Sequence, residues 1–297
     1  MEVMNSPEYP FYKPSVIREF LSQKSSAPLK KWGQNFLIDP NAVQTLFSSA
    51  ESELLQKSEL LIEIGPGLGA LSHILYRLNK KLKLYEIDPV YYEWLKEFLP
   101  EIDISLGDAR ETLDDPHGLT CFLFGNLPYY ITSELILLSL EKLSGLLGAV
   151  FLVQKEFAQR VTQEISSLSV YAGAYGKFQS RKTIKAGCFY PAPNVDSSIL
   201  TFTANRRFVN KNSYQILELL CRVSFWGKRK KIGSSIKEAP LQSFYPNRLP
   251  LDLSEEDIRQ KLRESLESAG LSLDKRPEEL SAENFYQAVD GFPLQKI

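Results

Sequence analysis

The stretch NLPY (residues 126–129) follows the apolar residues 121–125 and carries groups that could hold a flat, polar ring. The Asn126 side-chain oxygen and the Leu127 carbonyl are suitable acceptors for the two protons of an exocyclic amine. Pro128 fixes the turn and removes a competing N–H, and Tyr129 can stack on a base. An isolated N-x-P-Y is more often an ordinary β-turn, so the surrounding residues must decide between a turn and a catalytic site.

A glycine-rich loop, EIGPGLGALS, lies upstream of this stretch. Gly65 and Gly67 allow the backbone to approach a ligand closely. The spacing Gly65-x-Gly67-x-x-Ala70 matches the relaxed dinucleotide fingerprint, and Glu86 follows Gly65 by 21 residues, the spacing of a carboxylate that accepts ribose hydroxyls. A glycine turn that only packs a helix on a strand gives the same pattern. At this point two cofactors fit, a nicotinamide dinucleotide and S-adenosylmethionine.

Two further carboxylates favour S-adenosylmethionine. Glu63 stands two residues before the first glycine, which counts against a nearby pyrophosphate and suits a positively charged methionine group. Asp108 follows the next apolar stretch, where it can accept a hydrogen bond from N6 of the cofactor's adenine.

The NLPY stretch could hold a second adenine, whose N6 would be the methyl acceptor. Such a reaction needs no general base before transfer, because the amine attacks a sulfonium directly. Catalysis would then depend mostly on positioning two reactants.

The elements that must position these residues alternate along the chain. Apolar runs predict strands at residues 60–64, 81–87, 102–106, 121–125 and 149–153, and helical spacing predicts helices at 68–78, 90–99 and 133–143. Asp39-Pro40 and Asp88-Pro89 are expected helix starts. This alternation predicts an α/β fold with a mostly parallel sheet and helices on both faces. In such sheets ligands bind at the carboxyl ends of the strands, where the polar residues fall.

The chain divides into three expected parts. Residues 1–28 are rich in Pro, Ser and Tyr and are interpreted as a peripheral extension with one short helix. Residues 29–205 form the expected α/β domain, and residues 206–297 change to a helical pattern. The 297 residues, 43% of them hydrophobic, suffice for one large and one smaller domain.

Composition limits the classes of function. Three dispersed cysteines and two histidines give no metal-binding spacing, so no metal site is expected. The longest apolar run, residues 145–153, is too short to span a bilayer, and no signal peptide is evident. We therefore expect a cytoplasmic protein without a membrane partner.

A basic stretch predicts where a polyanion would bind. The net charge is only −1, but residues 205–237 carry nine Lys and Arg against one acid. Phosphate contacts favour such clusters with aromatic neighbours, here Phe225 and Trp226. The expected RNA-binding residues are Arg222, Lys228, Arg229, Lys230 and Lys231. A solvated helix face is the alternative interpretation.

The motifs together resemble the ribosomal RNA adenine N6-dimethyltransferases, most closely the KsgA type that modifies small-subunit RNA. The resemblance extends from about Lys30 to about Ala288 and rests on KKWGQNFLID, EIGPGLGALS, YEID, GDA, GNLPYYITS, QKEFAQR, CFYPAPNVDSS, FWGKRKKI and RPEELSAENF. It implies a Rossmann-like S-adenosylmethionine-dependent methyltransferase domain with a seven-stranded, mostly parallel sheet and a small C-terminal helical domain. Trp32 and Tyr130 stand where the family usually has Phe and Asn.

The resemblance also implies roles for individual residues. Asn35 and Leu37 would close over the cofactor beside Gly65 and Gly67, Glu86 would hold its ribose, and Asp108 its adenine. Asn126, Leu127, Pro128 and Tyr129 would hold the target adenine, with Phe189 stacking on its other face. The implied substrate is 16S rRNA within the 30S subunit, with dimethylation of two adjacent adenosines near its 3′ end, and we expect a monomer.

Three alternatives remain open at the level of sequence. A 23S rRNA methyltransferase of the Erm resistance type shares much of the motif set, although Leu127 and the acidic tail favour small-subunit RNA. A non-catalytic ribosome-assembly factor could retain a relict site. A dehydrogenase is a more distant alternative, because it rests on the glycine loop and Glu86 alone.

Overall fold

The computed structural model describes residues 8–28, 33–227, 229–245 and 253–292. Lys30, Lys31, Trp32 and Lys228 lie outside this part of the chain, as do residues 246–252. The described chain forms two compact units, one of residues 1–158 and 178–204 and one of residues 159–177 and 205–297.

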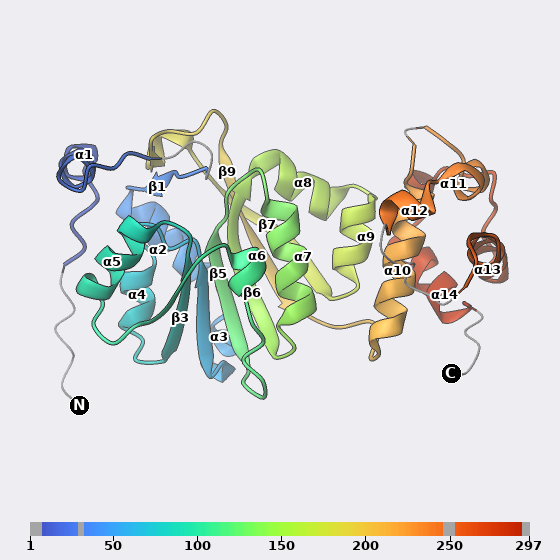
Figure 1. Cartoon of the computed structure of the whole chain (residues 1–297), viewed down its shortest axis with the longest axis horizontal. Helices are drawn as coiled ribbons and strands as arrows, with labels where there is room; N and C mark the ends of the chain where they lie inside the picture. Colours follow the sequence, from blue (N-terminus) through green and yellow to red (C-terminus); the bar gives the residue numbers. More distant parts are fainter. Residues whose placement is uncertain (1–7, 29–32, 228, 246–252, 293–297) are drawn as a thin grey trace. The chain divides into compact units, whose positions relative to one another are not determined.

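The first unit is built on a seven-stranded sheet in the order β4-β3-β2-β5-β6-β9-β7 (Figure 1). Its strands are β2 (Leu60–Ile64), β3 (Lys81–Glu86), β4 (Asp103–Leu106), β5 (Cys121–Asn126), β6 (Leu146–Gln154), β7 (Gly176–Ile184) and β9 (Ser197–Ala204). Strands β2 to β6 pair in parallel, and β9 pairs antiparallel with β6. The expectation of a seven-stranded, mostly parallel sheet is confirmed.

Helices connect and cover these strands. They are α1 (Pro14–Gln23), α2 (Pro40–Ser48), α3 (Ser52–Lys57), α4 (Ser72–Tyr76), α5 (Pro89–Phe98), α6 (Ala109–Thr112) and α7 (Thr132–Lys142), with α8 (Lys155–Gln163) following β6. Helices α2 and α3 contact β6, whereas α5 and α6 contact β3 (Figure 1). The side chains of Asp39 and Asp88 accept bonds from backbone N–H groups at the starts of α2 and α5, as expected for N-caps.

A two-stranded sheet joins distant parts of the chain. Strand β1 (Phe36–Leu37) pairs antiparallel with β8 (Phe189–Tyr190), which follows the short 3₁₀-helix η2 (Ala186–Cys188). This pairing places the GQNFL motif against the FYPAP loop. Sequence patterns did not predict it, because two-residue strands carry no periodicity.

The described N-terminal segment contributes four side chains to the core, so the prediction of a peripheral extension is wrong for residues 9–21. Tyr9, Phe11, Ile17 and Leu21 are all buried and belong to the main hydrophobic cluster of this unit. The short helix predicted there is present as α1. Aromatic packing explains the difference, since the Phe11 ring lies 5.0 Å from both the Phe20 and Trp94 rings.

The second unit is helical. Its elements are α9 (Ser167–Gly173), α10 (Lys211–Ser224), α11 (Ile232–Glu238), α12 (Leu241–Phe244), α13 (Glu255–Ser268), η3 (Pro277–Glu279) and α14 (Ala282–Asp290). Helix α10 contacts α9, α11 and α14, and α13 contacts α11 and α14. The division of the fold therefore differs from the expected 29–205 domain at residues 159–177, because α9 packs on α10 and α14. The change of unit after Ala204 lies close to the expected boundary.

Candidate active site

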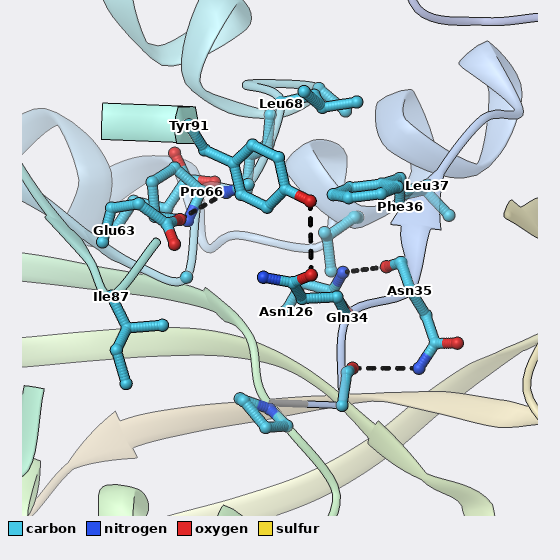
Figure 2. A pocket seen from close by; sticks show the side chains of 18 of the residues that line it. Gln34, Asn35, Phe36, Leu37, Glu63, Pro66, Leu68, Ile87, Tyr91 and Asn126 are labelled. Carbon is cyan, nitrogen blue, oxygen red and sulfur yellow. Dashed lines mark hydrogen bonds between the residues drawn. The ribbon is translucent and has the colours of Figure 1, made fainter. Parts of the chain in front are cut away.

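The carboxyl ends of three neighbouring strands contribute to one pocket (Figure 2). Glu86 is the last residue of β3, Gly65 directly follows β2, and Asn126 is the last residue of β5. The order β3-β2-β5 places these ends next to one another, and all three residues line the pocket. The pocket therefore lies where a ligand is expected to bind in an open α/β sheet.

The backbone conformation of the glycine loop in this pocket disfavours side chains. Gly65 and Gly67 have φ values of +71° and +56°, in the left-handed region that favours glycine. A Cβ atom on Gly67 would lie 3.3 Å from the Phe36 ring, and one on Gly65 would lie 3.4 Å from the Asn126 carbonyl oxygen. The loop can therefore present its backbone directly to a ligand.

Two buried carboxyls face the loop. Glu86 is 3% exposed, and its oxygens accept bonds from the N–H groups of Gly67 at 2.9 Å and Asp88 at 2.8 Å. Glu63 is 2% exposed and accepts a bond from the Ser72 hydroxyl at 2.7 Å. Burial raises the pKa of Glu86 to about 7 and that of Glu63 to about 8, with repulsion from Glu86 adding to the Glu63 shift.

Asn126 is oriented by the segment that precedes β1. Its Nδ2 donates to the Asn35 carbonyl at 3.0 Å (Figure 2), and the Asn35 side chain donates to the Gly33 carbonyl at 3.0 Å. The Asn126 amide nitrogen is thus engaged, whereas Asn126 Oδ1 accepts no hydrogen bond from the described residues. The same holds for the Leu127 carbonyl, although the Leu127 N–H donates to Leu152 at 3.2 Å. Two acceptors are therefore available at adjacent positions.

The remaining residues of the NLPY turn are fixed by hydrogen bonds. The Pro128 carbonyl accepts from Ile131 N at 3.2 Å and from the Thr132 hydroxyl at 2.9 Å, which joins the turn to α7. The Tyr129 and Ser197 hydroxyls lie 2.6 Å apart. Burial raises the pKa of Tyr129, so its phenol stays neutral. These contacts hold the two acceptors and the Tyr129 ring in one rigid turn.

Gln34 and Tyr91 belong to the pocket although the sequence analysis did not assign them. The Gln34 amide donates to an Asp88 oxygen at 2.9 Å, and the Tyr91 hydroxyl donates to Gln34 Oε1 at 3.2 Å (Figure 2). Gln34 lies within the motif KKWGQNFLID, and that motif was the sequence signal that could have identified it. Leu37 lines the same pocket, as expected.

Asp108 and Phe189 do not join this group of residues. The Asp108 carboxylate is held by the Arg110 guanidinium at 2.6 Å, which lowers the Asp108 pKa, and Asp108 is not among the pocket residues. Phe189 is 3% exposed and packs in the main hydrophobic cluster. The position of Phe189 therefore does not support the expected stacking role, because the core already covers its ring.

Neither a metal cluster nor a membrane span is found in the described part of the chain. No group of three or more His, Cys, Asp or Glu side chains that could hold a metal ion occurs there. No helix among those residues is both long and apolar enough to cross a bilayer.

The ribosomal RNA adenine dimethylase family model matches residues 28–251, which is most of the chain. This chain belongs to that family.

The curated relatives of this chain include proteins named ribosomal RNA small subunit methyltransferase A. The one from Borreliella afzelii is 33% identical over 280 residues, covering 91% of each chain. The one from Protochlamydia amoebophila is 30% identical and covers 93% of this chain and 95% of its own length. That from Treponema denticola is 29% identical, with 88% and 92% covered.

Two solved structures show the same fold. A dimethyladenosine transferase from Plasmodium falciparum has a TM-score of 0.63 at 24% identity and covers 84% of this chain and 94% of its own. The 23S rRNA methyltransferase ErmE has a TM-score of 0.60 at 22% identity, with 86% and 99% covered. At these identities the likeness shows the fold and does not separate the two RNA substrates.

Adenine dimethylases of this family are S-adenosylmethionine-dependent methyltransferases, and the pocket fits this cofactor. The loop at Gly65 and Gly67 has left-handed φ values and no side chains, so its backbone can approach a ligand. Glu86 would hold the ribose through carboxylate acceptors, and Glu63 would face the cationic methionine group. Bound S-adenosylmethionine supplies the electrophilic methyl group.

We expect the affinity for S-adenosylmethionine to rise with pH between about pH 6 and about pH 8. The pKa values of Glu86 and Glu63 lie near 7 and 8 because burial disfavours their charged forms. A cationic ligand favours the ionised carboxylates, so binding releases protons and weakens as the pH falls through these values. Over this range Glu86 can contribute up to about tenfold and Glu63, with its higher pKa, up to about fiftyfold. Calorimetric titration in buffers of different ionisation enthalpy measures both the affinity and the protons released.

The matched control for this pH dependence is Glu63→Gln, which keeps an oxygen acceptor for Ser72 but cannot titrate. Its affinity should depend less steeply on pH than that of the wild type. An affinity that is flat with pH in both proteins would contradict the carboxylate assignment.

Proposed function

We propose that this chain dimethylates N6 of two adjacent adenosines near the 3′ end of 16S rRNA, in the small ribosomal subunit and as part of subunit biogenesis. The observation that carries the proposal is the pair of unengaged acceptors, Asn126 Oδ1 and the Leu127 carbonyl, at the end of β5 beside the cofactor pocket. An adenine N6 amine has two protons, and two adjacent acceptors match them.

The chain's own residues would raise the reactivity of this amine. The N6 lone pair is delocalised into the adenine ring, so the nitrogen is a poor nucleophile. Hydrogen bonds from both protons to Asn126 and Leu127 favour a pyramidal nitrogen with its lone pair free to attack. The Tyr129 ring, fixed through Ser197, can stack on a base that has left its helix or loop. This arrangement contributes by positioning.

The small-subunit substrate is preferred to large-subunit RNA on two observations. The curated relatives with up to 33% identity are small-subunit methyltransferases by name, whereas ErmE is similar at 22% identity. We further propose that the protein acts as a monomer in the cytoplasm and needs no metal.

To test this proposal, the protein is incubated with labelled S-adenosylmethionine and either unmethylated 30S subunits or naked large-subunit RNA. Modified adenines are mapped by mass spectrometry of nuclease fragments. We expect pairs of dimethylated adenines from 30S subunits alone. Label in large-subunit RNA would indicate a resistance-type enzyme, and no label in either RNA would favour a binding factor.

The basic stretch of the second unit is proposed as an RNA contact, although its charge is partly neutralised within the protein. Arg222 pairs with Glu218 at 2.8 Å, Lys231 pairs with Asp274 at 3.2 Å, and Lys230 pairs with Glu238. These acids include residues outside the stretch, so the sequence count overstates the available charge. Such exposed pairs are weak and can be exchanged for phosphates.

We expect Arg229→Ala to weaken RNA binding by a few-fold and to reduce the slope of log affinity against log salt by about one. Arg229 is exposed and has no ion pair within the described residues, so its charge is available to a phosphate. Filter binding of 30S subunits at several salt concentrations measures both quantities. Lys57→Ala, which removes an exposed lysine of α3 paired with Glu53, is the control. Equal slopes for both variants would remove Arg229 from the RNA contact.

A further inference from the structure

The N-terminal segment reaches the cofactor pocket through Tyr9. Tyr9 is 4% exposed and lines the pocket together with Glu63 and Gly65. Its ring stacks on His73 of α4, with centroids 5.0 Å apart and planes inclined by 11°, and lies edge-on to Tyr12 at 4.8 Å. These ring contacts fix the position of the Tyr9 side chain in the pocket wall.

The Tyr9 hydroxyl is enclosed and has no hydrogen-bond partner within the described residues. At the same site the hydroxyls of Tyr129 and Tyr91 each have a hydrogen-bond partner, Ser197 and Gln34 respectively. A buried hydroxyl without a partner costs about 1–3 kcal/mol, and such groups are rare in folded proteins unless a ligand or water completes them. Phenylalanine would fill the same place without this cost, so the hydroxyl requires a partner that the described residues do not supply.

The charges around Tyr9 indicate the kind of partner. Burial and the nearby Glu63 carboxyl both raise the pKa of Tyr9, so the phenol stays protonated and can donate. Glu63 itself already accepts the Ser72 hydroxyl. A ligand that presents a cation to Glu63 and an anion to a neutral donor would satisfy both residues, and the amino-acid end of S-adenosylmethionine carries an ammonium and a carboxylate on one carbon.

We propose that Tyr9 is a cofactor-binding residue whose hydroxyl donates a hydrogen bond to the carboxylate at the amino-acid end of S-adenosylmethionine. In this arrangement Glu63 pairs with the ammonium group, and Glu86 accepts hydrogen bonds from the ribose hydroxyls. The inference rests on the cofactor of the proposed function and extends it to a segment that lies upstream of the matched family region, which begins at residue 28.

The same N-terminal segment also packs against β8. Helix α1 places the Arg18 guanidinium 5.7 Å from the centre of the Tyr190 ring, and Tyr190 follows Phe189 in β8. A cofactor that completes Tyr9 would therefore stabilise a segment that also contacts β8.

The test compares Tyr9→Phe with the wild type by calorimetry of the cofactor-free protein. The probes are S-adenosylmethionine, S-adenosylhomocysteine and 5′-methylthioadenosine, which lacks the amino-acid end. We expect the affinity for the first two to fall about tenfold, as for the loss of a hydrogen bond to a charged group. The affinity for 5′-methylthioadenosine should remain within about twofold, because that probe has no carboxylate for Tyr9.

Thermal unfolding of the ligand-free proteins separates this role from a structural one. Since Tyr9→Phe removes an unpartnered hydroxyl and keeps the ring, its melting temperature should equal or exceed that of the wild type. Tyr12→Phe, in the same segment but outside the pocket lining, is the matched control and should leave all three affinities unchanged.

Three outcomes would overturn the proposal. Equal losses for all three probes would mean that Tyr9 shapes the pocket generally, and an unchanged affinity for S-adenosylhomocysteine would mean that its hydroxyl makes no contact. Failure of the wild type to bind any probe would instead remove the cofactor assignment of the proposed function, and the Tyr9 contact with it.

Discussion

Replacement of Asn126 by alanine should lower the rate constant for methyl transfer by about 10²–10³-fold, the usual effect of removing one preorganised polar group from a transition state. The substitution removes Oδ1, one of two acceptors available to the N6 protons. The Leu127 carbonyl would remain but could engage only one proton, leaving the lone pair more delocalised. Single-turnover transfer from saturating labelled S-adenosylmethionine to 30S subunits measures this step directly.

Asn126→Ala also removes the Nδ2 bond to the Asn35 carbonyl, so a control must separate the two losses. Asn126→Asp keeps an acceptor oxygen in the same place but cannot donate to Asn35. We expect the aspartate variant to bind S-adenosylmethionine more weakly, yet to keep transfer within about tenfold of the wild type once the cofactor is saturating. A second control, Tyr129→Phe, keeps the stacking ring and loses only the contact with Ser197.

Equal rate losses in the alanine and aspartate variants would mean that the bond to Asn35 matters more than the acceptor. A transfer rate for Asn126→Ala within tenfold of the wild type would falsify the proposed activation of N6. Either result would leave family membership intact and change the role given to β5.

The strand ends could be predicted because local signals there agree with one another. The apolar run Leu60–Ile64 is the observed β2, and the runs that precede Glu86 and Asn126 end at the carboxyl ends of β3 and β5. In a parallel sheet these ends share one edge. Alternation of strands and helices therefore sufficed to bring a glycine loop and two polar residues together without any knowledge of distant contacts.

The N-terminal segment could not be predicted because its burial depends on distant partners. Tyr9 stacks on His73 and Phe11 packs against Trp94, residues more than sixty positions away. Proline, serine and tyrosine in the segment favour a loop locally, and no periodicity reveals that the loop is covered.

The surroundings of the basic stretch and of Phe189 also depend on distant parts of the chain. The basic stretch looked unopposed until folding brought Asp274 to Lys231, across 43 residues. The resemblance implied a stacking role for Phe189, whereas pairing of β8 with β1 brings its ring into the hydrophobic cluster. Sequence gives residue types, whereas availability to a ligand depends on which neighbours the fold supplies.

Replacement of Glu86 by alanine should reduce the affinity for S-adenosylmethionine by at least about 10²-fold, because hydrogen bonds to a charged group contribute about 1.5–3 kcal/mol each. The same change should destabilise the ligand-free protein, since the Gly67 and Asp88 N–H groups lose their acceptors. Each buried N–H left without a partner costs about 1–3 kcal/mol. Calorimetry measures the first effect and urea unfolding the second.

The loss of stability should itself depend on pH. The pKa of Glu86 is raised to about 7 in the folded protein by burial, so the folded state binds more protons than the unfolded state between the ordinary glutamate value and 7. Wild-type stability conferred by Glu86 is then greatest below this window and declines as the pH rises through it. The free-energy difference between wild type and Glu86→Ala should be larger at about pH 5 than at about pH 8.

The ribose contact can be isolated from this structural effect with a modified ligand. 2′-Deoxy S-adenosylhomocysteine lacks one of the ribose hydroxyls that would donate a hydrogen bond to Glu86. Glu86→Ala should therefore cost less affinity for this ligand than for S-adenosylhomocysteine itself. If the carboxylate only braces the glycine loop through Gly67, both ligands would lose affinity equally. The difference between the two losses therefore decides whether Glu86 touches the cofactor or acts on it through the loop.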